Sequence, residues 1–227
     1  QHNSIDPQMV SLHSAIAADS VLFNSDWNRR SFLDGVDALF RRLPDGIPEG
    51  TLELLAAKSF VLPVPIDDHV FINNEGCRNP EVGECLWSNG RELRPCSSRL
   101  RIVWAAQFGY ASSRTQYYEW LGSADVILST ALHEFQGLAV LEAVAAGCVP
   151  IAPEREVYPE LFAPEYLYPD GGDDIPAEAA HAAALIENQS VDSHHERLTV
   201  PDVKRFSRDA LTPVYKTLLS KAIAGSA

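Results

Sequence analysis

Short apolar runs alternate along the chain with longer segments of helical periodicity. Residues 124–130 are apolar enough for a fully buried strand, and residues 147–153 begin a second strand after a glycine. Between them, residues 137–146 carry apolar side chains at helical spacing and end at Gly147, a common helix terminator. The order strand, helix, strand predicts a βαβ unit with parallel strands.

The amino-terminal part shows a similar alternation. An apolar strand is predicted at residues 21–23, and Ser25 or Asp26 is placed to cap a helix that stops before Pro44. The side chains expected on the core face of this helix are Trp27, Leu33, Val36 and Phe40.

The composition changes between two predicted domains. An apolar strand at 60–66 ends the first domain, expected at residues 1–70. Residues 71–98 are polar, rich in Gly, Pro and Asn, and too long for an ordinary connection, so they are predicted to be a linker or insertion. The second domain, residues 99–227, opens with a strand at 100–105.

Two glutamates mark the βαβ unit. Glu134 lies in the loop after the first strand, and Glu142 lies in the helix that begins near Gly137. Ligands bind at the carboxyl ends of parallel strands, and a helix start offers N–H groups to a phosphate. The unit therefore suits a sugar nucleotide, with Glu134 near the sugar and Glu142 near the ribose. The alternative places both glutamates on solvated surface, the usual position for this residue type. The surrounding His-Glu-Phe-x-Gly and Leu-Glu-Ala residues favour the ligand site.

This pattern resembles the two glutamates, separated by seven residues, of retaining glycosyltransferases in family four. Other segments are similar to the tRNA-queuosine mannosyltransferase family, namely residues 17–25, 28–33, 42–45, 133–135, 158–160 and 165–168. The resemblance implies an α/β fold of GT-B architecture, in which two Rossmann-like domains face a cleft. It also implies transfer of mannose from GDP-mannose to queuosine in tRNA, with retention at the anomeric carbon.

The same resemblance implies roles for individual residues. Glu134 is expected to be catalytic, and the donor-binding set is His133, Gln136, Gly137, Leu138, Ala139 and Glu142. The acceptor or cleft candidates are His2, Asn3, Asn24 and Ser25. For His2 and Asn3, a loop that caps the first helix is an equally good explanation. His133 equally suits a structural loop. No cofactor or metal ion is expected, because GT-B enzymes hold the diphosphate with basic residues and helix ends.

The sequence departs from the family pattern after the strand at 100–105. These enzymes normally continue into a basic loop and roughly two further βα units. Here residues 107–110, Gln-Phe-Gly-Tyr, follow at once. We therefore expect that segments of the protein are missing from this sequence, including basic residues that would hold the diphosphate. An internally deleted, inactive relative is the alternative.

Charge limits the classes of partner. The chain has 31 acidic and 18 basic residues, a formal net charge of −13, which disfavours indiscriminate binding of nucleic acid. It favours a small metabolite or glycan as acceptor, although a local basic patch can serve one tRNA. The most basic region holds Arg29, Arg30, Arg41 and Arg42, which solvated helix-face charges explain at least as well. A non-catalytic nucleotide-sugar or RNA-binding module stays open as a third function.

The remaining composition points to a cytoplasmic protein that does not enter a membrane. No run of about 18 apolar residues occurs, so no membrane span is predicted. Cys77, Cys85 and Cys96 do not have the spacing of zinc ligands and are expected to be free thiols, whereas Cys148 is expected to be a core residue. The oligomeric state does not follow from the sequence.

Overall fold

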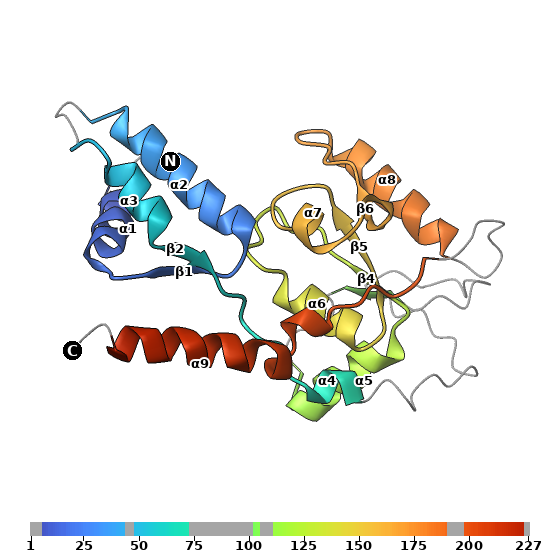
Figure 1. The fold of residues 1–227 in the computed structure, drawn as a ribbon. Helices are drawn as coiled ribbons and strands as arrows, with labels where there is room; N and C mark the ends of the chain where they lie inside the picture. Colours follow the sequence, from blue (N-terminus) through green and yellow to red (C-terminus); the bar gives the residue numbers. More distant parts are fainter. Residues whose placement is uncertain (1–5, 44–47, 73–101, 105–110, 190–197, 225–227) are drawn as a thin grey trace. The chain divides into compact units, whose positions relative to one another are not determined.

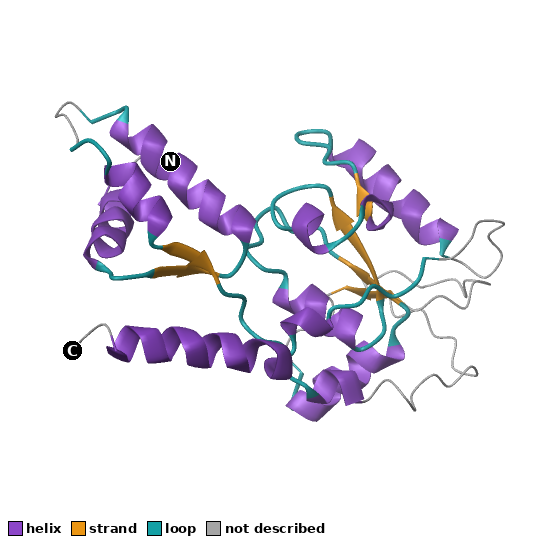
Figure 2. Cartoon of the chain, viewed as in Figure 1, coloured by secondary structure: helices purple, strands orange, loops and turns teal. Residues whose placement is uncertain are grey.

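The computed structural model describes residues 6–43, 48–72, 102–104, 111–189 and 198–224. The chain divides into two compact units, Gln1–Pro63 and Val64–Ala227. In both, helices alternate with short parallel strands (Figure 2), and the predicted α/β class is confirmed. His2, Asn3, the three cysteines of the linker and nearly all of the linker itself lie outside the described residues.

The first unit is built on two parallel strands (Figure 1). Its β1 pairs with β2, with Val21 opposite Ser59. The elements are α1 (Asp6–Ala17), β1 (Val21–Phe23), α2 (Asp26–Phe40), α3 (Thr51–Ala57) and β2 (Ser59–Val61). The strand predicted at 60–66 is shorter than expected. Pro63 and Pro65 lack the N–H group that continued pairing requires.

The core of the first unit corrects one prediction. Its buried residues are Leu12, Ala15, Val36, Leu39 and Leu55, with Leu33 and Phe40 packed against them. Trp27 lies outside this cluster. It precedes Val36 by about two and a half helical turns, so the two side chains leave opposite sides of α2. Phe32, which was not predicted to be a core residue, packs against this cluster, and its ring centroid lies 5.2 Å from that of Phe23.

The second unit holds a four-stranded parallel sheet in the order β3, β4, β5, β6. The strands are β3 (Ile102–Trp104), β4 (Val126–Leu128), β5 (Val149–Pro153) and β6 (Leu167–Tyr168). Helix α5 (Arg114–Ser123) connects β3 to β4, and α6 (Leu138–Ala145) connects β4 to β5. The predicted βαβ unit is therefore confirmed.

The second unit has further helices around this sheet. They are α4 (His69–Ile72), α7 (Tyr158–Leu161), α8 (Ile175–Asn188) and α9 (Arg208–Ala224), with 3-10 helices at Pro164–Tyr166 and Lys204–Phe206. Within the described part of the chain, no helix is both long enough and apolar enough to cross a membrane.

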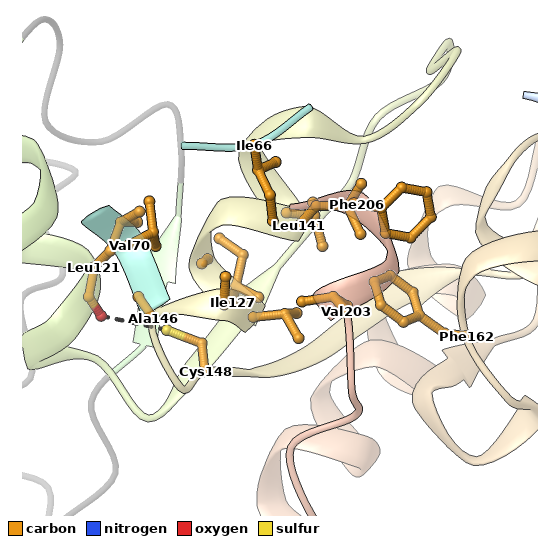
Figure 3. Packing of buried hydrophobic residues seen from close by; sticks show 14 of the residues in the cluster. Ile66, Val70, Leu121, Ile127, Leu141, Ala146, Cys148, Phe162, Val203 and Phe206 are labelled. Carbon is orange, nitrogen blue, oxygen red and sulfur yellow. Dashed lines mark hydrogen bonds between the residues drawn. The ribbon is translucent and has the colours of Figure 1, made fainter. Parts of the chain in front are cut away.

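Alternate side chains of the second sheet enter two different cores, as the pleat of a strand requires. Ile127 and Ala152 pack on the side of α5 and α6, whereas Val126 and Ile151 pack on the side of α8. Figure 3 shows the first of these cores, where the Sγ atom of Cys148 lies 3.4 Å from the carbonyl oxygen of Leu121. Cys148 is fully buried, which confirms it as a core residue.

Candidate functional site

Loops that follow β4, β5 and β6 meet at the carboxyl edge of the second sheet. Arg155, just after β5, connects them. Its Nε donates to the carbonyl oxygen of Ala131 at 3.0 Å, and its Nη1 donates to Asp170 at 2.8 Å. The guanidinium also donates twice to Glu178 of α8, at 2.8 and 3.0 Å. The Arg155 side chain thus links the loops after β4, β5 and β6 to α8.

The ion pair between Arg155 and Glu178 is largely shielded from water. Only 10% of the Arg155 side chain and 14% of the Glu178 side chain are exposed. The hydrogen bonds from Arg155 lower the pKa of Glu178, and the same carboxylate raises the pKa of Arg155. Asp170 has a lowered pKa chiefly because the N–H of Gly172 donates to it. Two carboxylates, those of Asp170 and Glu178, therefore neutralise the positive charge of Arg155.

Replacing Glu178 with Gln is expected to lower the free energy of unfolding by about 2 kcal/mol near neutral pH, the usual worth of hydrogen bonds to a charged group. Folding lowers the pKa of Glu178. The stabilisation that its ionised carboxylate provides is therefore complete above the unfolded pKa of about 4.3, and it is lost as pH falls through the folded pKa. Urea unfolding near neutral pH and at about pH 3 measures the difference. Glu187→Gln, an exposed glutamate on the same helix, is the control. Equal effects of the two substitutions at both pH values would contradict this account.

The carboxylate of Glu134 lies at the amino terminus of α6. Its Oε1 accepts the main-chain N–H groups of Phe135, Gln136 and Gly137 at 3.0, 3.2 and 2.8 Å. Gly137 has φ 73°, a left-handed conformation that suits glycine, and it precedes the first residue of the helix. An anionic oxygen at this position also meets the positive end of the helix dipole. Three main-chain N–H groups at the start of α6 therefore hold a negatively charged oxygen, which here belongs to Glu134 itself.

Gln136 has a firm structural partner. Its side chain is only 2% exposed, and its Nε2 donates to the carbonyl oxygen of Val64 at 2.7 Å. The N–H of Val64 donates back to Oε1 at 2.9 Å. The amide thus pairs with main chain much as a neighbouring strand would. Its expected role in donor binding stays a prediction, as do those of Leu138 and Ala139, which are exposed on the first turn of α6.

Glu142 is half-buried and receives a hydrogen bond from α5. The hydroxyl of Tyr117 donates to its Oε2 at 2.7 Å. Burial and the adjacent carboxylate raise the pKa of Tyr117, so the phenol keeps its proton and remains a donor. Glu142 is therefore held in a fixed direction, which solvated surface does not provide. The contact was missed in the sequence, because 25 residues separate the two side chains.

Two buried tyrosines support the start of the loop that carries Glu134. The Oγ of Ser129 lies 2.6 Å from the hydroxyl of Tyr158, and the hydroxyl of Tyr168 donates to the Ser129 carbonyl oxygen at 2.7 Å. Burial raises the pKa of Tyr158 to about 12. Both phenols therefore stay protonated and able to donate near neutral pH.

Glu156, in the loop after β5, was not predicted as a site residue from the sequence. Its Oε1 lies 3.1 Å from Nδ1 of His133, and its Oε2 accepts the main-chain N–H of Glu134. Its φ is 52°, a left-handed conformation that costs a non-glycine residue about 1–3 kcal/mol. Glu156 therefore contacts both the ring of His133 and the main chain of Glu134. The side chain of His133 is nevertheless 86% exposed.

The candidates in the first unit are engaged in local contacts. Ser25 caps α2 by accepting the N–H of Asn28 at 3.1 Å, as one of the alternatives predicted. The Oδ1 of Asn24 accepts from the Asn28 side chain at 2.8 Å. Their contact with an acceptor stays a prediction.

The basic region of the first unit carries ion pairs within α2 and at its carboxyl end. Arg29 and Arg30 both pair with Asp26, at 2.8 and 2.9 Å, and Arg41 pairs with Asp37. These contacts fit helix-face charges. Among the described residues, no group of three or more His, Cys, Asp or Glu side chains gathers as metal ligands would.

Comparison with known proteins finds a matching family model and matching curated proteins. Residues 1–66 match the family model described as tRNA-queuosine alpha-mannosyltransferase N-terminal. The tRNA-queuosine alpha-mannosyltransferase of Drosophila melanogaster is 30% identical over 199 residues, a match that covers 68% of this chain and 52% of the fly protein. The chain thus spans about half the length of this curated relative. No solved structure gives a significant match.

The family model and the fly protein match different lengths of the chain. The family model falls on the amino-terminal segments, and the fly protein extends the similarity over most of the chain. The resemblance to the tRNA-queuosine mannosyltransferase family that the sequence indicated is therefore confirmed, and residues 1–66 are similar to the amino-terminal domain of that family.

Proposed function

We propose that the protein is a retaining glycosyltransferase that transfers mannose from GDP-mannose to queuosine in tRNA, in the cytoplasm and without a metal cofactor. The similarity to the fly enzyme carries this proposal. The acidic side chain of Glu134 at the start of α6 supports it, because sugar-nucleotide chemistry needs an anion site beside a carboxylate. In the proposed GT-B architecture, the second unit holds the donor.

The proposed reaction uses the carboxyl edge of the second sheet. The bond between the anomeric carbon and the diphosphate oxygen breaks, and a bond to a queuosine hydroxyl oxygen forms on the same face. The hydroxyl proton leaves with GDP. The transition state has oxocarbenium character, which the carboxylate of Glu134 stabilises.

Two further groups complete the proposed donor site. The diphosphate replaces the Glu134 carboxylate at the N–H of Gly137 and extends to those of Leu138 and Ala139, which offset its charge. Glu142 accepts hydrogen bonds from the ribose hydroxyls with the carboxylate that Tyr117 holds.

The test incubates full-length protein with GDP-mannose and tRNA that either contains or lacks queuosine. Nucleoside mass analysis is expected to show one added hexose on queuosine alone. The net charge of −13 favours a small metabolite or glycan as the second candidate acceptor. Hydrolysis or transfer of the donor with no change in either tRNA would support that candidate. GDP binding without donor turnover would support a binding module.

Replacing Tyr117 with Phe is expected to weaken GDP affinity about three- to tenfold, because one hydrogen bond of about 1 kcal/mol that orients Glu142 is lost. Calorimetric titration with GDP measures the change. Tyr118→Phe, on the same helix, removes a hydroxyl that does not bond to Glu142 in the structure and is the control. Unchanged affinity in the Tyr117 variant would argue against the role of Glu142 at the ribose.

A further inference from the structure

Glu156 occupies a backbone conformation that glycine would adopt with less strain. Among the described residues it is the non-glycine position with positive φ. Such strain persists only where the surrounding contacts enforce it, and it concentrates at functional sites. Stability alone would favour glycine here, so the side chain of Glu156 needs another explanation.

The side chain of Glu156 bridges two loops. Only 14% of it is exposed, and its two carboxylate oxygens contact consecutive residues of the loop after β4. Oε1 lies beside the ring of His133, and Oε2 accepts the main-chain N–H of Glu134. The loops after β4 and β5 are therefore joined at the residue that carries the proposed catalytic carboxylate.

Two carboxylates divide the N–H groups of this loop between them. Glu156 accepts the N–H of residue 134, and Glu134 accepts those of residues 135, 136 and 137. A donor diphosphate at the start of α6 competes only with the second carboxylate. The contact from Glu156 remains, so the main chain stays fixed while the side chain of Glu134 turns toward the sugar.

We propose that Glu156 is a positioning residue, which holds the main chain of Glu134 in place for sugar transfer. The inference rests on the proposed function, because its effect appears in the transfer step. It concerns kcat rather than donor affinity, since the N–H groups at the start of α6 do not contact Glu156 in the structure.

The test compares Glu156→Gly with Glu156→Gln in full-length protein. Glycine relieves the positive φ and removes both contacts, so kcat is expected to fall roughly 10- to 100-fold, as misplacement of a reacting group does, with little loss of thermal stability. Glutamine keeps an oxygen for the N–H of Glu134 and an amide for His133, so it is expected to restore most of the rate. GDP affinity is expected to stay within about threefold in both variants.

Glu154→Gly is the matched control, because it removes an exposed carboxylate from the same loop and is expected to keep the wild-type rate. A wild-type kcat for Glu156→Gly would overturn the inference and leave the proposed function standing. Parallel losses of kcat and GDP affinity would also overturn it, since they would show general distortion of the site. A wild-type protein that transfers no mannose would overturn the proposed function itself.

Discussion

Replacing Glu134 with Gln is expected to lower kcat for mannosyl transfer about 10²- to 10³-fold, as removal of one preorganised electrostatic group typically does. The amide keeps the size of the side chain but loses the negative charge that stabilises an oxocarbenium-like transition state. The loop is expected to persist, because the amide oxygen can still accept the N–H groups that Oε1 accepts now.

In the Glu134→Gln variant, kcat is expected to fall without a loss of GDP affinity. GDP affinity is expected to be unchanged or higher, because one negative charge is removed from the position that the diphosphate takes. Single-turnover transfer and GDP titration measure the two effects. Glu154→Gln removes a charge from the exposed part of the neighbouring loop and is the control. Wild-type rates for Glu134→Gln would remove this residue from the mechanism.

Replacing Gly137 with Ala is expected to have the second large effect. At φ 73° an added Cβ would lie 3.2 Å from Cδ1 of Leu161 and 3.6 Å from Cε1 of Tyr158. The left-handed conformation alone costs a non-glycine residue roughly 1–2 kcal/mol, and the contact with Leu161 adds to it. The main chain must shift at the N–H that the diphosphate needs, so GDP affinity is expected to fall about tenfold or more.

Gly122→Ala provides the matched control for Gly137→Ala. Gly122 lies within α5, and a Cβ there meets no atom within 4 Å. Alanine is therefore expected to stabilise the protein by about 0.5–1 kcal/mol and to leave GDP binding unchanged. Denaturant unfolding and GDP titration distinguish the two variants. A Gly137→Ala protein with wild-type affinity would show that these N–H groups do not hold the donor.

The elements of the second unit could be predicted because their sequence signals are local. The apolar run that forms β4, Gly137 and the glycine after α6 define the βαβ unit within about 30 consecutive residues, the usual span of this motif. Strand β1 matches its predicted bounds for the same reason. The wrong placement of Trp27 came from counting apolar residues without following their direction around α2.

The partners of the candidate residues could not be predicted in the same way. Glu134 reaches Glu156 across 22 residues, Glu142 reaches Tyr117 across 25, and Gln136 reaches Val64 across 72. Such contacts depend on strand order and register, which bring loops together at one edge of the sheet. The strained backbone of Glu156 has no signal in residue type, since glycine would be the expected residue there.

Transfer to queuosine tests the central claim most directly. Wild-type protein and the Glu134→Gln variant are incubated with GDP-mannose and queuosine-containing tRNA, and the nucleosides are analysed by mass. The account predicts a hexose on queuosine with wild-type protein and at most a trace with the variant over the same time. No hexose with wild-type protein, or equal amounts with both proteins, would contradict it.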